Sequence, residues 1–290
     1  MSRLADALER VATKVENLSA LDPAAAAAQK LTGALPPGRL KDLLSGSDLG
    51  HPVHPLLVTL PIGAFSSAVA LDLTGDPVAA RRLIGLGILS SLPTAMTGAS
   101  DWSDTLDAER RVGLLHAALN SVALSAFATS WVLRRSPGRG KVSALVGLGF
   151  LGASGWLGGH LSYAMGVGVD TTAFSPPPTD WTDVCEAAEL IDDRPTAFAV
   201  DGLPVLLIRR AGSIDAIVNR CTHRGAPLDE GSLVGDCIEC PWHGSRFRLT
   251  DGMVERGPAS RPQPVLQTRV AGLRVQVRRA EPRALRVNPA

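Results

Sequence analysis

Long uncharged runs dominate the middle of the sequence, and charged residues separate them from one another. The runs cover residues 53–71, 83–100, 112–133 and 142–169. A helix needs about 20 apolar residues to cross a hydrocarbon core of roughly 30 Å, and the last two runs exceed that length. The first two are shorter and contain Pro61 and Pro93. We predict a four-helix transmembrane bundle over residues 50–170, with a buried soluble bundle as the alternative.

The fourth run is rich in glycine, and Gly155 and Gly159 form a G-x-x-x-G pair within it. Small residues at this spacing let membrane helices approach closely, so we expect a helix contact at this pair. Because these glycines lie inside an uncharged run and not between a strand and a helix, they do not form a phosphate-binding loop.

Residues 1–49 precede the bundle and predict an amphipathic helix followed by a linker. Apolar side chains recur within residues 1–21 at alternating spacings of four and three residues: Leu4, Leu8, Val11, Val15 and Leu18. This stripe is typical of a helix that packs on its own protein, and a partner-binding or membrane-surface helix is the alternative. Residues 35–50 are rich in proline and glycine and predict a linker with one short helix.

The pattern changes after three consecutive prolines, Pro176, Pro177 and Pro178. Consecutive prolines form a stiff spacer, so residues 171–180 predict a linker. The short apolar stretches that follow are typical of β-strands, and turn dipeptides separate them. They cover residues 196–200, 205–209, 215–218, 266–270 and 273–277. We predict a soluble all-β domain over residues 181–280 and a tail over residues 281–290.

Charge and cysteine content exclude several classes of function. Lys and Arg total 29 against 28 Asp and Glu, and a net charge of +1 offers no basic surface for nucleic acid. The four cysteines all lie after residue 180 and are too few for a disulfide-rich secreted scaffold. No flavin or nicotinamide fingerprint occurs, so any reductase chemistry must come from another protein.

The cysteines and histidines of the β region form one pattern that carries chemistry. Cys221 is followed by His223, and after sixteen intervening residues Cys240 is followed by His243. Each pair lies on one short segment, so two loops can clamp a small object between them. A zinc finger groups cysteines first and histidines later, whereas alternating thiolates and imidazoles suit a [2Fe–2S] cluster with mixed ligands. Cys185 and Cys237 are left over, and we expect Cys237 to be a buried thiol on a strand.

Residues 180–280 resemble a ferredoxin-type Rieske domain, and residues 240–247, Cys-Pro-Trp-His-Gly-Ser-Arg-Phe, match the second cluster loop of that family closely. The resemblance implies that the two cysteines hold one iron and the two histidines hold the other: Cys221 and Cys240, His223 and His243. It also implies that Gly257-Pro258 lies in a loop that covers the cluster. The expected fold is therefore mixed, a transmembrane bundle followed by an all-β Rieske domain.

Departures from the respiratory-complex branch of the Rieske family bear on the reduction potential. Those proteins carry an extra cysteine on each cluster loop, joined by a disulfide, where this chain has Ala226 and Trp242. They also carry a tyrosine whose hydroxyl bonds a cysteine sulfur, where this chain has Phe247, although Ser245 remains as a donor. Hydrogen bonds to sulfur raise the potential, so their loss predicts a low value.

The histidine count decides between an oxygenase and an electron carrier. An oxygenase would need a second, mononuclear iron held by two histidines and a carboxylate. Only six histidines occur, two belong to the cluster pattern, and none follows His243. We therefore expect a membrane-anchored, oxidoreductase-type carrier that exchanges single electrons with unidentified donor and acceptor proteins. A redox sensor whose cluster state is read by the membrane helices is the alternative, and a plain anchor is a third hypothesis.

The bundle is similar to a family of small four-helix membrane domains of unknown function. The residues that carry this resemblance are Gly50-His51-Pro52-Val53-His54-Pro55, Leu60-Pro61-Ile62-Gly63 and Gly158-Gly159-His160. Together with His116, four histidines lie in or beside the helices, and polar groups inside a membrane are costly and usually functional. We expect either helix–helix hydrogen bonds, or a quinone bound by His116 or His160, or a haem b held by that pair.

Two signals disagree on the side of the membrane that holds the β domain. Four helices put both termini on one side, where four basic residues flank the helix ends, and six flank them on the other side. The positive-inside rule thus favours external termini. The polar N-terminus has no signal-peptide pattern, and the missing disulfide also favours the cytoplasm. We expect an integral protein of the cell membrane with a cytoplasmic β domain.

Overall fold

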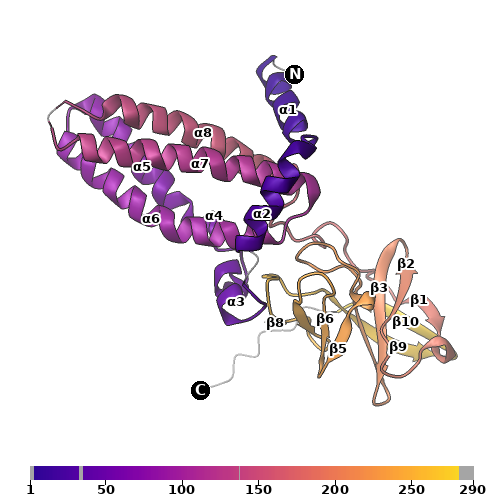
Figure 1. Ribbon diagram of the computed structural model, residues 1–290. Coiled ribbons are helices and arrows are strands. Elements are labelled where there is room, and N and C mark those ends of the chain that lie inside the picture. The colour runs from indigo at the N-terminus through magenta and orange to yellow at the C-terminus, as the bar shows by residue number, and fades with distance from the viewer. Residues whose placement is uncertain (1–2, 33–34, 137, 281–290) are drawn as a thin grey trace, which may run out of the picture. The chain divides into compact units, whose positions relative to one another are not determined.

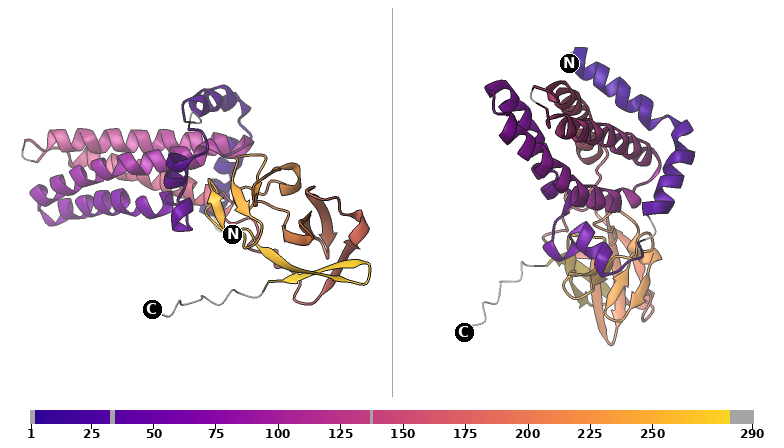
Figure 2. Two further views of the ribbon diagram at one scale, coloured as in Figure 1. Left: turned by 90° about the horizontal axis from the view of Figure 1, so that it is seen from below. Right: turned by 60° about the vertical axis from the view of Figure 1, so that its left-hand side comes forward.

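The chain forms two compact units, which Figure 1 and Figure 2 show from three directions. The computed structural model describes residues 3–32, 35–136 and 138–280, and the predicted tail lies outside them. The helical unit comprises Met1–Pro36 and Pro52–Val169, and the β unit comprises Pro37–His51 and Asp170–Ala290. The chain therefore enters the β unit twice.

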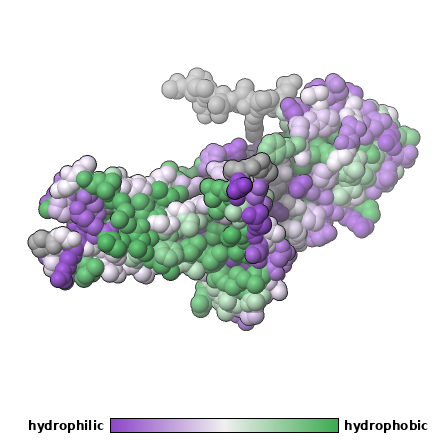
Figure 3. Space-filling model, turned by 90° about the horizontal axis from the view of Figure 1, so that it is seen from above, coloured by the Kyte–Doolittle hydropathy of each residue, from purple (hydrophilic) through white to green (hydrophobic). Residues whose placement is uncertain are grey.

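Four helices of the helical unit have the length and apolar character of membrane spans: His54–Thr74, Pro77–Ser103, Asp107–Leu133 and Lys141–Tyr163. The first combines α4 (His54–Leu57) with α5 (Thr59–Thr74), and the others are α6, α7 and α8. They lie side by side in Figure 1 and Figure 2, and Figure 3 shows apolar residues over the face of the bundle in view. The four-helix prediction is confirmed.

Local sequence signals set the connection between the first two spans. Asp76 caps α6 by accepting a hydrogen bond from the N–H of Ala79 (3.0 Å), and Pro77 occupies the first turn. Gly75 ends α5 in the left-handed conformation (φ 90°), which glycine adopts without strain. A tight connection between two antiparallel helices follows from these residues.

Two shorter helices precede the spans, α1 (Arg3–Glu16) and α2 (Asp22–Thr32). Val15 of α1 is buried in one cluster with Val112 of α7 and Leu157 of α8. The stripe predicted from the sequence is therefore only partly packed on the protein's own helices, because Leu4, Val11 and Leu18 are exposed.

Two stacked aromatic rings form the centre of the bundle. Phe65 of α5 and Phe127 of α7 lie nearly parallel (6°), with ring centroids 3.9 Å apart. A Cβ on Gly87 would lie 2.5 Å from Phe65, and a Cβ on Gly147 would lie 2.9 Å from Phe127. The two glycines therefore leave the room that the stack occupies.

We expect Gly87→Ala to destabilise the helical unit, because overpacking a close contact costs about 1–3 kcal/mol. Thermal unfolding of the detergent-purified protein measures this change. Gly149→Ala is the matched control in another span, since nothing lies within 4 Å of a Cβ at that position. Equal stability of the two variants would contradict this account of the packing.

Among the described residues, no neighbouring helix of the chain comes within 4 Å of a Cβ at either glycine of the predicted G-x-x-x-G contact. Nothing lies within 4 Å of a Cβ built on Gly155, and only Tyr163 of the same helix approaches one on Gly159. Gly158 instead faces α7, where the ring of His116 comes within 3.1 Å of its Cβ position. Successive helix positions differ in direction by about 100°, so the spacing alone did not identify the buried face.

Two antiparallel sheets form the β unit, in the orders β1-β10-β9-β4-β3-β2 and β5-β6-β7-β8. The larger sheet contains β1 (Thr182–Glu186), β2 (Thr196–Val200), β3 (Leu203–Arg210), β4 (Ser213–Val218), β9 (Val265–Ala271) and β10 (Arg274–Arg279). The smaller contains β5 (Ser232–Val234), β6 (Cys237–Glu239), β7 (Arg246–Arg248) and β8 (Val254–Arg256). The five stretches predicted from the sequence correspond to β2, β3, β4, β9 and β10.

One buried hydrophobic cluster joins the two sheets and anchors the loops that contain Cys221 and Cys240. Leu206 and Ile217 of the larger sheet pack with Phe247 of the smaller sheet, and Cys221 and Cys240 belong to the same cluster. The β unit is completed by α3 (Arg39–Ser45) and the turn η2 (Ser47–Leu49). The predicted short helix is therefore present, but its segment packs within the β unit.

Candidate metal centre

Two loops of the β unit have nearly the same backbone conformation. In the first, the N–H of Gly225 donates to the carbonyl of Cys221 (2.8 Å), and in the second, the N–H of Gly244 donates to the carbonyl of Cys240 (3.1 Å). Both glycines have positive φ angles, 77° and 72°. Each loop thus closes in one tight turn, and glycine meets the backbone requirement at the same position in both.

The sulfur atoms of the two loops lie next to one another. The Cys221 thiol donates to Cys240 and, together with the N–H groups of Trp242 and His243, lowers the pKa of Cys240 to about 7. The same thiol–thiol bond, together with burial, raises the pKa of Cys221. The N–H groups of His223 and Arg224 also point at the Cys221 sulfur. Each sulfur therefore accepts hydrogen bonds from two backbone N–H groups of its own loop.

The imidazole rings of the two loops form a second pair. The ring centroids of His223 and His243 are 5.1 Å apart, and the rings meet edge to face (84°). Within the described residues, no three cysteine, histidine or acidic side chains surround a single ion position. Two adjacent sulfurs and two adjacent imidazoles suit a binuclear group with two protein ligands on each iron, whereas a zinc site needs four ligands around one ion.

A third loop, around Gly257-Pro258, is held by two side-chain oxygens. Ser245, which is fully buried, accepts a hydrogen bond from the N–H of Ala259 (2.9 Å). Asp42 accepts one from the N–H of Gly257 (2.8 Å). The Ser245 hydroxyl keeps its own hydrogen to donate, and its predicted role as a donor to a cysteine sulfur stays a prediction.

Sequence reasoning missed the residue that ties the first loop to the sheet. Gln263 is buried, donates from Nε2 to the carbonyls of Val218 (2.6 Å) and Arg220 (2.9 Å), and accepts from the N–H of Thr222 (3.2 Å). A glutamine between two prolines gave no signal for this role, because its partners are more than 40 positions away.

The histidines of the helical unit take part in hydrogen bonds between or within helices. Nδ1 of His54 donates to the carbonyl of Thr94 (3.0 Å). Nδ1 of His116 lies 2.8 Å from the carbonyl of Ser154 on α8, and its Nε2 lies 3.0 Å from the amide nitrogen of Asn120. His51 falls in the segment that belongs to the β unit.

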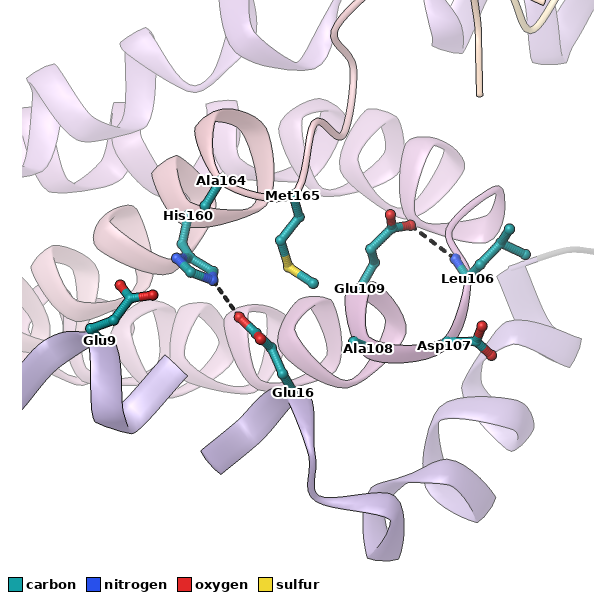
Figure 4. Close-up of a pocket in the computed structure, with 9 residues that line it drawn as sticks. All are labelled: Glu9, Glu16, Leu106, Asp107, Ala108, Glu109, His160, Ala164 and Met165. Carbon is teal, nitrogen blue, oxygen red and sulfur yellow. Dashed lines mark hydrogen bonds and ion pairs between the residues drawn. The ribbon is translucent and has the colours of Figure 1, made fainter. Parts of the chain in front are cut away.

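His160 lines a cavity of about 500 Å³ between α1, the start of α7 and the end of α8. Its Nε2 donates to Oε1 of Glu16 (2.7 Å), and its ring stacks on Trp156. Figure 4 shows this bond together with the carboxylates of Glu9 and Glu109 on the cavity wall. The cavity thus combines a buried imidazole with carboxylates, a set of groups that can accept and release protons.

Comparisons with known proteins match two families, one for each part of the chain. Residues 180–272 match the Rieske [2Fe-2S] domain family, and residues 50–171 match the predicted membrane protein family DUF2231. Ferredoxin CarAc of Metapseudomonas resinovorans is 34% identical over 94 residues, which are 31% of this chain and 85% of that protein. Cytochrome b6-f complex iron-sulfur subunit 2 of Nostoc sp. is 43% identical over 67 residues, 22% of this chain and 36% of that subunit.

One solved structure is also similar in sequence. The ferredoxin of carbazole 1,9a-dioxygenase from Nocardioides aromaticivorans is 33% identical, with a TM-score of 0.33. The match covers 37% of this chain and all of that one. The similarity to ferredoxin CarAc, of which this chain covers 85%, shows that the chain belongs to the Rieske [2Fe–2S] domain family, and its residues 50–171 match the DUF2231 family.

Proposed function

We propose that this protein is a membrane-anchored electron carrier in which two loops of the β unit hold the cluster. The ligands are two cysteines and two histidines: Cys221, His223, Cys240 and His243. The observation that carries the proposal is the adjacent pair of sulfurs beside the adjacent pair of imidazoles. When bound, the cluster supplies one-electron chemistry, and the chain's own N–H groups stabilise negative charge on the sulfurs.

Reversible redox cycling tests the carrier function. The detergent-purified protein should lose visible absorbance when dithionite reduces it and regain that absorbance when an oxidant is added. A carrier must survive many such cycles, because it returns to its starting state after each electron. A cluster that breaks down on its first reduction would argue against this function.

We expect the midpoint potential to lie toward the low end of the roughly −150 to +300 mV range of Rieske centres. At the two positions where the respiratory branch has disulfide cysteines, this chain has Ala226, which is fully buried, and Trp242. At the position of the tyrosine hydroxyl it has Phe247, which is also fully buried. An EPR-monitored redox titration measures the potential, and Phe247→Tyr should raise it by adding a donor. A wild-type midpoint above about +200 mV on that scale would contradict the expectation.

A quinone is the membrane partner that we infer for this carrier. A quinol must release a proton with each electron, and the His160–Glu16 pair lies in a cavity with room for a quinone ring. We do not propose a haem b, because Nε2 of His160 is hydrogen-bonded to Glu16 and Nε2 of His116 is hydrogen-bonded to Asn120. Axial ligation by the two histidines would break both bonds.

The quinone proposal predicts that His160→Ala slows cluster reduction by added quinol at least tenfold while the cluster spectrum stays unchanged. His54→Ala is the matched control, because this histidine joins two helices and lies outside the cavity lining. Equal rates in wild type and both variants would exclude the quinone site and leave the carrier proposal intact. A sharp haem absorption band in the reduced protein would instead restore the haem hypothesis.

Orientation in the membrane is also a proposal, and we place the β unit in the cytoplasm. Protease added to intact cells should then leave the β unit whole, and the same protease should digest it after the cells are opened. Digestion in intact cells would put the β unit outside, in line with the six basic residues that flank the opposite helix ends.

A redox sensor remains the second candidate, because the chain enters the β unit twice and so links the cluster region to the helices at more than one point. A sensor predicts that hydrogen exchange in the four spans changes when the cluster is oxidised or reduced. A carrier predicts the same exchange in both states.

A further inference from the structure

A segment far from the Rieske domain in sequence packs within the same unit as the candidate cluster loops. Pro37–His51 belongs to the β unit, although the residues on either side of it belong to the helical unit. The match to the Rieske family begins only at residue 180. The segment is therefore an addition to the domain that the family comparison describes, and we call it the N-terminal strap.

The strap contacts the surroundings of the cluster loops at separate points. A Cβ on Gly257 would lie 2.0 Å from Oγ of Ser47, so the strap approaches the covering loop as closely as a glycine allows. A Cβ on Gly244, directly after the candidate ligand His243, would lie 3.4 Å from Pro37. At the far end of the strap, Arg261 donates to the carbonyl of Gly50 (3.3 Å).

One side chain of the strap makes a polar bond to the covering loop. The Asp42 carboxylate accepts a hydrogen bond from the N–H of Gly257 (2.8 Å). Pro258 has no N–H, so the two backbone donors that flank it are those of Gly257 and Ala259. Ser245 of the Rieske domain accepts the second of these, and the strap accepts the first. The loop is thus fixed from two sides by side-chain oxygens.

The environment of Asp42 indicates that this bond has a structural purpose. Burial raises the pKa of Asp42, and the hydrogen bond from Gly257 opposes that shift. Carboxylates without a partner usually stay exposed to solvent, as Asp48 of the same strap does, whereas Asp42 is partly buried. Charge-assisted hydrogen bonds are stronger than neutral ones, so the bond from Gly257 offsets part of the cost of burying the group.

We propose that the N-terminal strap is a working part of the cluster site and that Asp42 is a positioning residue, which holds the covering loop over the cluster through the N–H of Gly257. This inference rests on the proposed function. The strap then shields the cluster from solvent and iron chelators and sets the electrostatic surroundings of the covering loop. It also makes the sequence before the first membrane span necessary for a stable cluster.

Paired substitutions at Asp42 separate the hydrogen bond from the charge. Asp42→Ala removes the acceptor, and we expect the cluster to be lost to an iron chelator at least roughly fivefold faster, in line with the energy of a hydrogen bond to a charged group. Asp42→Asn keeps an oxygen acceptor and should restore the rate to within about twofold of wild type. Asp48→Ala removes a carboxylate of the same strap that lies in solvent, and it should behave as wild type.

The experiment uses the full chain in detergent, with chelator-induced bleaching and the EPR line shape as readouts. Asp42→Ala should also change the EPR line shape of the reduced cluster, since the covering loop moves relative to it. A wild-type bleaching rate in Asp42→Ala would overturn the inference, and so would equal acceleration in Asp42→Ala and Asp42→Asn. A wild-type protein without iron would instead overturn the proposed function.

Discussion

Cys240→Ser or His243→Ala should remove the cluster from the full-length protein, with loss of its visible absorbance and EPR signal. Each iron has only two protein ligands in the proposed arrangement, so the loss of one leaves that iron without a closed coordination shell. The membrane spans do not depend on the cluster, and both variants should still be found in the membrane fraction. Iron analysis of the purified variants gives the size of the effect.

A third cysteine provides the control for this experiment. Cys237 is buried on β6, and its thiol donates a hydrogen bond to Oε2 of Glu255 (2.6 Å). Burial, and to a smaller extent this hydrogen bond, raises the pKa of the thiol to about 12. Cys237→Ser keeps the donor and should retain the full iron content. Retention of two irons in Cys240→Ser would show that the ligand assignment is wrong.

Breaking the buried ion pair between Asp72 and Arg134 should cost the helical unit about 3–5 kcal/mol, because the remaining charge has no equivalent partner. Nη1 of Arg134 donates to Oδ1 of Asp72 (2.7 Å), and the two side chains are only 3% and 6% exposed. Lys141 donates to the carbonyl of Asp72 (2.8 Å). These three residues therefore connect the ends of α5, α7 and α8.

Thermal unfolding of Asp72→Asn in detergent measures this cost as a lower midpoint temperature. Arg135→Ala is the control, because this neighbouring arginine is exposed and should change stability little. The double variant Asp72→Leu/Arg134→Met should recover most of the loss, since apolar replacement of a whole buried pair is often neutral. An unchanged midpoint temperature in Asp72→Asn would show that the ion pair does not stabilise the helical unit.

The elements that could be predicted from sequence are those whose signals are local. Uncharged runs of helical length gave the four spans, and the two loops could be read because Cys221 and Cys240 each precede a histidine by two or three positions. Strands β5 to β8 are only three residues long, which is too short for a period-2 pattern to be recognised.

What the sequence did not predict depends on contacts between distant positions. The strap was interpreted as a linker because its prolines and glycines are typical of one, and nothing in residues 37–51 indicates that Asp42 meets Gly257, 215 positions later. The pair of Asp72 and Arg134 is separated by 62 positions. Because neither residue is unusual within its own segment, only the folded chain identifies the pair.

The iron, sulfide and electron content of the full-length protein tests the central claim most directly. The protein is purified in detergent from cells supplied with iron, analysed for metal and acid-labile sulfide, and titrated coulometrically. Two irons, two sulfides and one electron per chain are the predicted result, because a [2Fe–2S] centre accepts a single electron. One zinc per chain with no iron would contradict the account, as would a chain that holds iron but takes up no electron.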